Sequence, residues 1–516
     1  MRRALHVLEG LGPQEQRNTT WSLEHSYDHP YFGQLFLAGA LGILSYPDSL
    51  NSTIGDVYSI EMLHLLPRIL MGVLAVVDTF LIYKVTERRY NNRNVAFIAA
   101  ILFAVMPMSW LTRRILLDSL FLPFLLLSIL FAINIKYRNT KNSDIPNYEL
   151  GSKNDCDNKA SLLTLLSGIF FGLAIFTKIP AFTMLPLVGF LIYDSANGSN
   201  NNYYARRRKL KILGLWFMPV ILIPLIWPVY AVSAGELENW LTGLSWQATE
   251  LAYRPLWNSL SDISKFDPVL FALGISAVIY AALIKRDSLI ILWIVPFIVF
   301  FYIVDHLRDI HWIPIIPIFC IAAAVLIVDI SIKISSKTLR QIIPFATISS
   351  IGIFGLVTTA TLVTSDLNST FFEIYAFIVA YLPSQDKSNG NDNAEDRTIM
   401  MGHNWMQIYS WIPKYIFDKD HDFKTFKRFF GSVKEPNLPI KEGEKVLLLV
   451  DGNDLERYIK SESTKKNVKQ KELYNETKLV TEFKGKVFHH ARDGYPYRTV
   501  GENPGIAKGI ELRSNY

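Results

Sequence analysis

The sequence predicts an α-helical, multi-pass membrane protein with about ten transmembrane helices and a C-terminal extracytoplasmic α/β domain. Half of the 516 residues are hydrophobic and 19% are charged, which differs strongly from the composition of a soluble domain. Apolar runs of nearly bilayer-spanning length recur between residues 64 and 365. Beyond residue 366 the chain becomes charged and this pattern stops.

Ten apolar runs define the predicted membrane domain, residues 64–365, because each approaches the length of about 20 residues that a spanning helix needs. A shorter apolar run follows Pro30 and predicts a helix that lies in the membrane interface, within an N-terminal loop of residues 1–63. The ten runs are 64–83, 95–111, 115–135, 161–177, 179–193, 211–233, 266–284, 288–304, 312–334 and 341–365.

The charge of the loops predicts the orientation. One alternating set of loops, from Lys84 to Arg340, holds 19 Lys and Arg residues, and the other set holds six. Cationic loops stay in the cytoplasm, so residues 1–63 and 366–516 are predicted on the extracytoplasmic side of the cell membrane. Membrane topology also accounts for the net charge of +6, so we expect no nucleic-acid partner.

The C-terminal region, residues 366–516, is predicted to form a soluble α/β domain. Two short apolar runs, 398–402 and 445–450, are bounded by turn-forming residues and predict buried strands. Helical patterns occupy 404–416 and 453–460. No glycine-rich phosphate loop or dinucleotide fingerprint occurs in the sequence, so nucleotide binding by those devices is not predicted.

A polar cluster precedes the interfacial helix, where Glu24, His25, Asp28 and His29 lie within six positions. By the predicted topology this cluster faces outward. No secretory signal is visible at Met1, so we expect a further membrane span upstream that would carry the loop across.

Further charged residues lie at the predicted outer ends of the spans, where they must reach water or find a partner. Arginine and lysine there can bind a lipid phosphate, and a neighbouring carboxylate can act as a base toward a hydroxyl. Together they suit displacement of a phosphate leaving group from a lipid-linked substrate. These residues are Arg68, Arg113, Arg114, Asp118, Lys178, Arg254, Asp305, His306, Arg308, Asp309 and His311.

Structural interpretations compete with these functional ones. Arg68 and Lys178 can be interfacial anchors, and Asp118 can pair with Arg114 one turn earlier. No residue is assigned to a metal, because His306 and His311 are five apart and so lie off one helical face. The sequence leaves use of a divalent metal open.

Five stretches, in order, resemble segments of GT-C-type glycosyltransferases, the group that contains protein O-mannosyltransferases and the aminoarabinose transferases of lipid A. "PMSWLTRRILLDSLFLPFLLLSILFAI" at 107–133 is similar to the family's Pro, Arg and Leu-Asp signature. "SGIFFGLAIFTKIPAFTMLPL" at 167–187 is similar to its Gly-Leu-Ala-x-x-Thr-Lys element. The other three stretches are 28–43, 66–85 and 309–319.

The resemblance implies a GT-C-like fold and a hexosyltransferase similar to the dolichyl-phosphate-mannose-protein mannosyltransferases. Such an enzyme takes a mannose-like hexose from a dolichyl or polyprenyl phosphate carrier. It transfers the sugar with inversion to a protein or lipid hydroxyl at the extracytoplasmic face. The expected partners are therefore this lipid-linked donor, the acceptor and the surrounding membrane lipids.

By position, the resemblance makes Asp118 the family's second acidic site residue, and Arg114 and Lys178 its signature cations. The family's first acidic residue follows an initial span that this sequence lacks. The base is therefore lost with an upstream segment, or replaced by Glu24 or Asp28, or the protein is inactive. The catalytic candidates are Asp118, Asp28 and Glu24, and the substrate-binding candidates are Arg114, Lys178, Arg68, His29 and Arg113.

Two functions from other classes compete with a transferase. Outward polar residues on ten spans can line a transport path, but the sequence shows no pair of similar halves with broken spans at matching positions. A non-catalytic membrane scaffold, which makes contacts through residues 366–516, is the other alternative.

Overall fold

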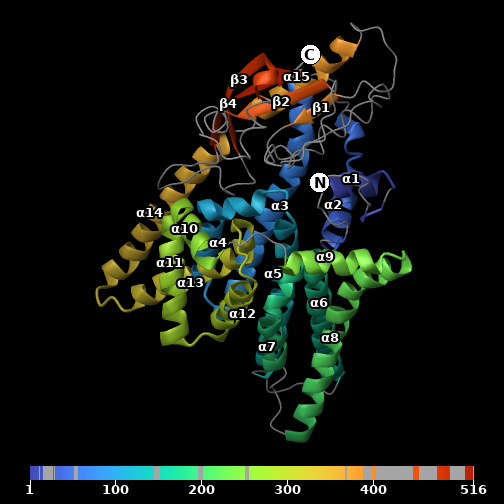
Figure 1. The fold of residues 1–516 in the computed structure, drawn as a ribbon. Helices are drawn as coiled ribbons and strands as arrows, with labels where there is room; N and C mark the ends of the chain where they lie inside the picture. The colour runs from blue at the N-terminus through green and yellow to red at the C-terminus, as the bar shows by residue number, and fades with distance from the viewer. Residues whose placement is uncertain are drawn as a thin grey trace.

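The computed structural model describes residues 1–514 apart from 11, 15–26, 28, 51–55, 144–150, 196–201, 250–254, 366–368, 387–397, 402–444, 452–473 and 489–505. Figure 1 shows long helices below a small sheet. The helices are α1 (Arg2–Leu8), α2 (Phe32–Ile43), η1 (Asp48–Leu50), α3 (Val57–Tyr90), α4 (Arg93–Val105), η2 (Pro107–Arg113), α5 (Leu117–Ser143), α6 (Gly151–Thr177), η3 (Ile179–Met184), α7 (Leu185–Ser195), α8 (Asn202–Ser233), α9 (Leu237–Thr249), α10 (Leu256–Phe266), α11 (Pro268–Tyr280), the π-turn η4 (Ala281–Lys285), α12 (Ser288–Val304), η5 (Asp309–Ile315), α13 (Ile316–Ile332), α14 (Lys337–Thr364) and α15 (Ser369–Asp386). The strands are β1 (Thr398–Met401), β2 (Lys445–Asp451), β3 (Lys478–Phe488) and β4 (Ile506–Ser514).

The predicted multi-pass helical class is confirmed. Within the described ranges, seven helices are long and apolar enough to cross a membrane, or eight if the bent pair α4 and η2 forms one span. All ten predicted apolar runs are helical, but two of them form the shorter helices Ile179–Ser195 and Ser288–Val304. The bend of 72° between α4 and η2 lies at Met106, because Pro107 forces the residue before it into an extended conformation.

Helices α5 and α6 form an antiparallel pair whose register brings two charged ends together. The Ser128 hydroxyl donates to the Ser167 carbonyl at 2.9 Å, and the Ser167 hydroxyl donates back to the Ser128 carbonyl at 2.9 Å. Asp118 lies ten residues before Ser128, and Thr177 lies ten residues after Ser167. Because both helices rise by about 1.5 Å per residue, Asp118 and the end of α6 reach the same level.

Helix α6 packs closely on α8 through two glycines. A Cβ on Gly168 would lie 2.5 Å from the Trp216 carbonyl oxygen, and one on Gly172 would lie 2.6 Å from the Pro219 carbonyl oxygen. Small residues four positions apart allow such close backbone approach between membrane helices. The contact fixes the position of α6 beside α8.

The small C-terminal sheet has the strand order β1-β2-β4-β3. The two predicted strands are confirmed as β1 and β2, and they pair in parallel. The β2–β4 and β3–β4 pairs are antiparallel. Leu447 and Leu512 of the sheet share a buried cluster with Phe371 and Tyr375 of α15 and with residues of α1, α2 and α3. The helical patterns predicted at 404–416 and 453–460 lie outside the described residues.

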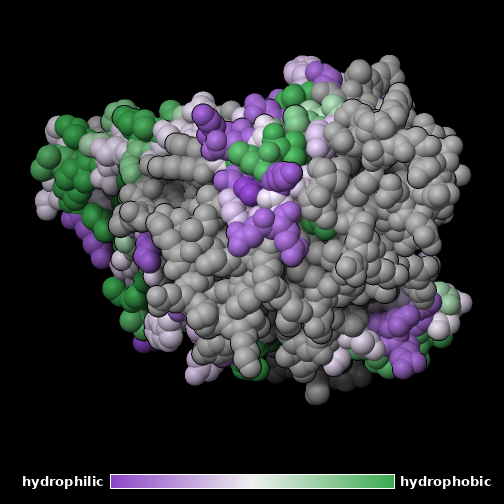
Figure 2. Space-filling view, turned by 45° about the horizontal axis from the view of Figure 1, so that its top comes forward, coloured by the Kyte–Doolittle hydropathy of each residue, from purple (hydrophilic) through white to green (hydrophobic). Residues whose placement is uncertain are grey.

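Exposed apolar side chains mark the surface that meets lipid. Hydrophobic residues gather at the left edge of Figure 2, where α14 lies in Figure 1. On α14, Phe345 is 74% exposed and Ile353 is 63% exposed. An outward apolar surface of this kind is expected for a helix whose solvent is the bilayer, and the protein is an integral membrane protein.

Candidate functional site

A buried ion pair joins the ends of α5 and α6. The Lys178 ammonium donates to the Asp118 carboxylate, and both side chains are about 5% exposed. Asp118 lies in the first turn of α5, and Lys178 directly follows the last residue of α6. Each charge therefore has the sign that its helix end favours. The predicted pairing of Asp118 with Arg114 is wrong, because Asp118 binds Lys178.

A second, partly buried pair forms between Arg114 and Asp309, which are 195 residues apart in the chain. Arg114 Nη1 lies 3.3 Å from Asp309 Oδ2, and the guanidinium also faces the Trp110 ring at 5.5 Å. The Asp309 side chain is 1% exposed, and its Oδ1 is buried without a hydrogen-bond partner. An unsatisfied buried acceptor costs about 1–3 kcal/mol, more if it is charged.

The segment that carries Asp309 is held by two tryptophans. Trp312 Nε1 donates to Ser259 Oγ at 2.7 Å, and Trp293 Nε1 donates to the Pro314 carbonyl at 2.8 Å. These bonds fix η5 to α10 and α12, so Asp309 has a defined position.

His311 extends the site on the same segment. Its Nδ1 accepts the Arg308 backbone N–H at 3.2 Å, so its proton is assigned to Nε2. The ring stacks on Phe301 and lies 5.8 Å from the His306 ring. Lys178, His306, Arg308 and His29 all lie close enough to His311 to interact with it electrostatically.

Helix α2 packs directly beside the Lys178–Asp118 pair. A Cβ on Gly33 would lie 2.7 Å from Leu117 Cδ2 and 2.9 Å from Thr177 Cγ2, the residues that immediately precede Asp118 and Lys178. The helix predicted to lie in the interface therefore forms part of the wall of the site. His29, four residues before Gly33, accepts Gln14 Nε2–H at its backbone carbonyl.

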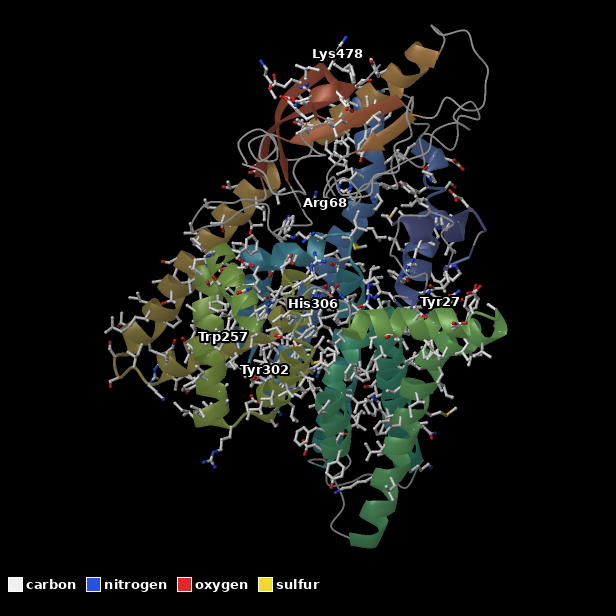
Figure 3. All side chains as sticks on the ribbon, viewed as in Figure 1. Tyr27, Arg68, Trp257, Tyr302, His306 and Lys478 are labelled. Atoms are coloured by element: carbon white, nitrogen blue, oxygen red, sulfur yellow. The ribbon has the colours of Figure 1, made fainter. Side chains whose placement is uncertain are left out.

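Aromatic side chains form another wall next to Lys178. Tyr27, Tyr31, Phe176 and Trp227 are buried together, and Trp240 of α9 packs against this cluster. Burial, with the nearby charges of Tyr230 and Glu236, raises the pKa of Tyr27 to about 12, so its phenol stays protonated at neutral pH. Figure 3 shows Tyr27 at the level of α9.

The remaining predicted residues are placed as follows. Arg113 Nη2 donates to the Ala104 carbonyl at 2.9 Å and thereby satisfies the end of α4. Arg68 is half-buried higher on α3, near His64, and makes no hydrogen bond or ion pair with the described residues (Figure 3). Glu24, Asp28 and Arg254 lie outside the described residues.

Sequence reasoning grouped Asp309 and His311 with the outer charges but did not select them. The signal for both was their place in "DHLRDIH", immediately before an apolar run. No group of three or more His, Cys, Asp and Glu residues that could hold a metal ion occurs where the structure is described.

Two ion pairs, Lys178–Asp118 and Arg114–Asp309, thus lie at one end of the helical domain. Arg114 and Lys178 belong to 107–133 and 167–187, the two segments with the most specific resemblance. Residues 23–235 match the dolichyl-phosphate-mannose-protein mannosyltransferase family. The resemblance predicted from the sequence is confirmed for this region. The matched region includes Lys178, Asp118 and Arg114 but ends before Asp309. No curated protein matches the chain in a sequence search.

Solved structures show low similarity over most of the chain. ArnT from Cupriavidus metallidurans bound to undecaprenyl phosphate has 11% identity and a TM-score of 0.47, covering 100% of this chain and 92% of its own. The Archaeoglobus fulgidus oligosaccharyltransferase, tethered to an acceptor peptide, has 11% identity and a TM-score of 0.45, covering 84% and 62%. At this level the similarities say nothing about individual site residues.

Proposed function

We propose that this protein transfers a mannose-like hexose from a dolichyl or polyprenyl phosphate carrier to a hydroxyl of a protein or lipid. The observation that carries the proposal is the buried Lys178–Asp118 pair inside the region that matches the mannosyltransferase family. The family's name supplies the donor class. The paired charges supply both a base and a phosphate-binding cation.

The proposed reaction is a single displacement. The acceptor oxygen bonds to the anomeric carbon, the bond from that carbon to the phosphate oxygen breaks, and the acceptor proton passes to a carboxylate. Attack opposite the leaving group inverts the anomeric configuration. The polyprenyl phosphate leaves as an anion, so it needs cationic stabilisation more than it needs a proton.

The residues divide between these roles by charge. Lys178 retains further N–H donors beside its bond to Asp118, and we propose that these donors and the Arg114 guanidinium hold the phosphate. Asp118 is the proposed base, and Glu24 and Asp28 are the alternatives that the sequence offers. His29, Arg68 and Arg113 are proposed supporting cations at the rim.

We further propose that the site faces the extracytoplasmic side. The support is the distribution of Lys and Arg, since the loops at 84–93 and 206–211 are strongly basic and the loop that carries Lys178 is not. A donor that arrives in the outer leaflet would then meet its acceptor outside the cytoplasm.

The test is a transfer assay with purified protein in lipid vesicles, polyprenyl-phosphate mannose and a Ser/Thr-containing peptide. We expect a glycosylated peptide whose anomeric configuration is opposite to that of the donor. The assay with and without a chelator determines metal dependence. If the vesicles move lipid-linked sugar across the membrane without any transfer to an acceptor, the protein is a transporter and the proposal is wrong.

A further inference from the structure

We propose that Asp309 binds a ring hydroxyl of the donor sugar through Oδ1, which makes it a specificity-determining residue that lies outside the family-matched region. This inference rests on the proposed function. Its starting point is the contrast between the two Asp309 oxygens, since Oδ2 pairs with Arg114 and Oδ1 is buried without a partner.

Asp78, inside α3, also has two buried oxygens without a partner, but a buried aspartate beside the same chain connection as Asp309 has none. Asp267 also packs against the α4–α5 connection, and both of its oxygens are satisfied, one by the Met108 N–H and one by the Leu270 N–H. Buried carboxylate oxygens are generally hydrogen-bonded, so an exception needs an explanation. A ligand that supplies the missing donor is such an explanation.

The chemistry of the atom selects the ligand group. A carboxylate oxygen accepts hydrogen bonds and repels anions, so Oδ1 requires an O–H or N–H donor and excludes the phosphate. A hexose attached to that phosphate carries several hydroxyl groups. Arg114, the proposed phosphate-binding cation, holds the other oxygen of the same carboxylate. A sugar whose phosphate lies on Arg114 therefore presents hydroxyls next to Asp309.

The surroundings restrict the movement of the carboxylate. Trp312 and Trp293 fix the segment through Ser259 and the Pro314 carbonyl. The Lys178–Asp118 pair and the Asp309 carboxylate are buried and Arg114 is partly buried, so a bound sugar has to displace the protein atoms that cover them in this structure. Because Oδ1 is held in place, the site can distinguish the intact sugar from a deoxy sugar. The deoxy sugar lacks the hydroxyl group and leaves Oδ1 without a hydrogen-bond donor.

The decisive variant is Asp309→Asn, which keeps the shape of the side chain. The amide has a single acceptor oxygen, which Arg114 recruits, so an N–H donor replaces Oδ1 at the sugar. The matched control is Asp56→Asn. Asp56 is the exposed N-cap of α3, and asparagine caps a helix as well as aspartate does.

The experiment measures kcat/KM with polyprenyl-phosphate mannose and with its monodeoxy forms. For the wild type we expect kcat/KM with one of the deoxy donors to be roughly 10- to 150-fold lower than with the intact donor. This is the range for loss of a hydrogen bond to a charged group. Asp309→Asn should lower kcat/KM for the intact donor by a similar factor. Removal of that one hydroxyl from the donor should then cause no further decrease in kcat/KM. The response of Asp309→Asn to the other deoxy donors, and all kcat/KM values for Asp56→Asn, should match those of the wild type.

Two results would overturn the proposal. If no deoxy donor is impaired in the wild type, or if Asp309→Asn loses the same factor with every donor, Asp309 only positions Arg114 or contacts the acceptor. Both results require transfer by the wild type, so they leave the proposed function intact. Absence of transfer from every lipid-linked donor overturns the proposed function, and this assignment with it.

Discussion

The Asp267 carboxylate accepts the backbone N–H of Met108 at 3.0 Å, across 159 residues of sequence. Its other oxygen accepts the Leu270 N–H at 2.9 Å and thereby caps α11. Met108 belongs to η2, which leads directly to Arg114. One buried side chain thus connects a helix cap to the segment that places a proposed phosphate-binding cation.

Asp267→Ser should separate these two roles. Serine is a good N-cap but is too short to reach Met108, so we expect near-normal thermal stability together with a raised KM for the lipid-linked donor. Asp267→Ala should lower both stability and activity. Asp56→Ser, at the exposed N-cap of α3, is the matched control, and a donor KM for Asp267→Ser equal to that of this control would exclude the positioning role.

The stability of the protein should depend on pH through Asp267. Burial raises its pKa to about 6 from 3.8, although the two backbone N–H groups oppose the shift. A raised folded-state pKa means that the stabilising contribution is complete below 3.8 and is lost as the pH rises through about 6. The free energy of unfolding should fall by roughly 3 kcal/mol over this pH range. Melting curves of detergent-solubilised protein should show this fall, and Asp267→Asn, which does not titrate, should show a flatter profile between about pH 4 and 7.

Asp118→Asn should abolish transfer. It should also destabilise the protein by about 3–5 kcal/mol, because it leaves the buried Lys178 charge without its partner. The double variant Asp118→Asn with Lys178→Met removes both charges, so we expect it to recover thermal stability and to remain inactive. A folded double variant with full activity would remove the pair from the proposed mechanism.

Gly33→Ala should disturb the site through packing alone. The added methyl group would contact Leu117 and Thr177 at 2.7–2.9 Å, so Asp118 and Lys178 would shift, with a destabilisation of about 1–3 kcal/mol. Gly39 on the same helix has open space around its Cα, so Gly39→Ala should be neutral or slightly stabilising. Equal melting temperatures and equal transfer rates for the two variants would contradict the proposed contact.

Much of the fold and part of the site follow from local sequence. Apolar run length identified the candidate spans among the described residues, and short apolar runs between turn formers identified β1 and β2. Strands β3 and β4 were missed, because "KLVTEFKGKVF" and "IAKGIELRS" alternate apolar with charged residues and lack a continuous apolar run. Strands that are partly exposed need only one buried face, so their signal is weaker.

The sequence by itself determined the membrane class, the family resemblance and the candidate residues Asp118, Lys178 and Arg114, because these depend on composition and on motifs within single segments. Only the tertiary structure decided which charges pair. Asp118 binds Lys178 rather than its neighbour Arg114, and Arg114 binds Asp309 from a segment 195 residues away. The physical reason is that burial in a low-dielectric interior makes an opposite charge necessary, whereas helix register and chain breaks at prolines determine which opposite charge is within reach.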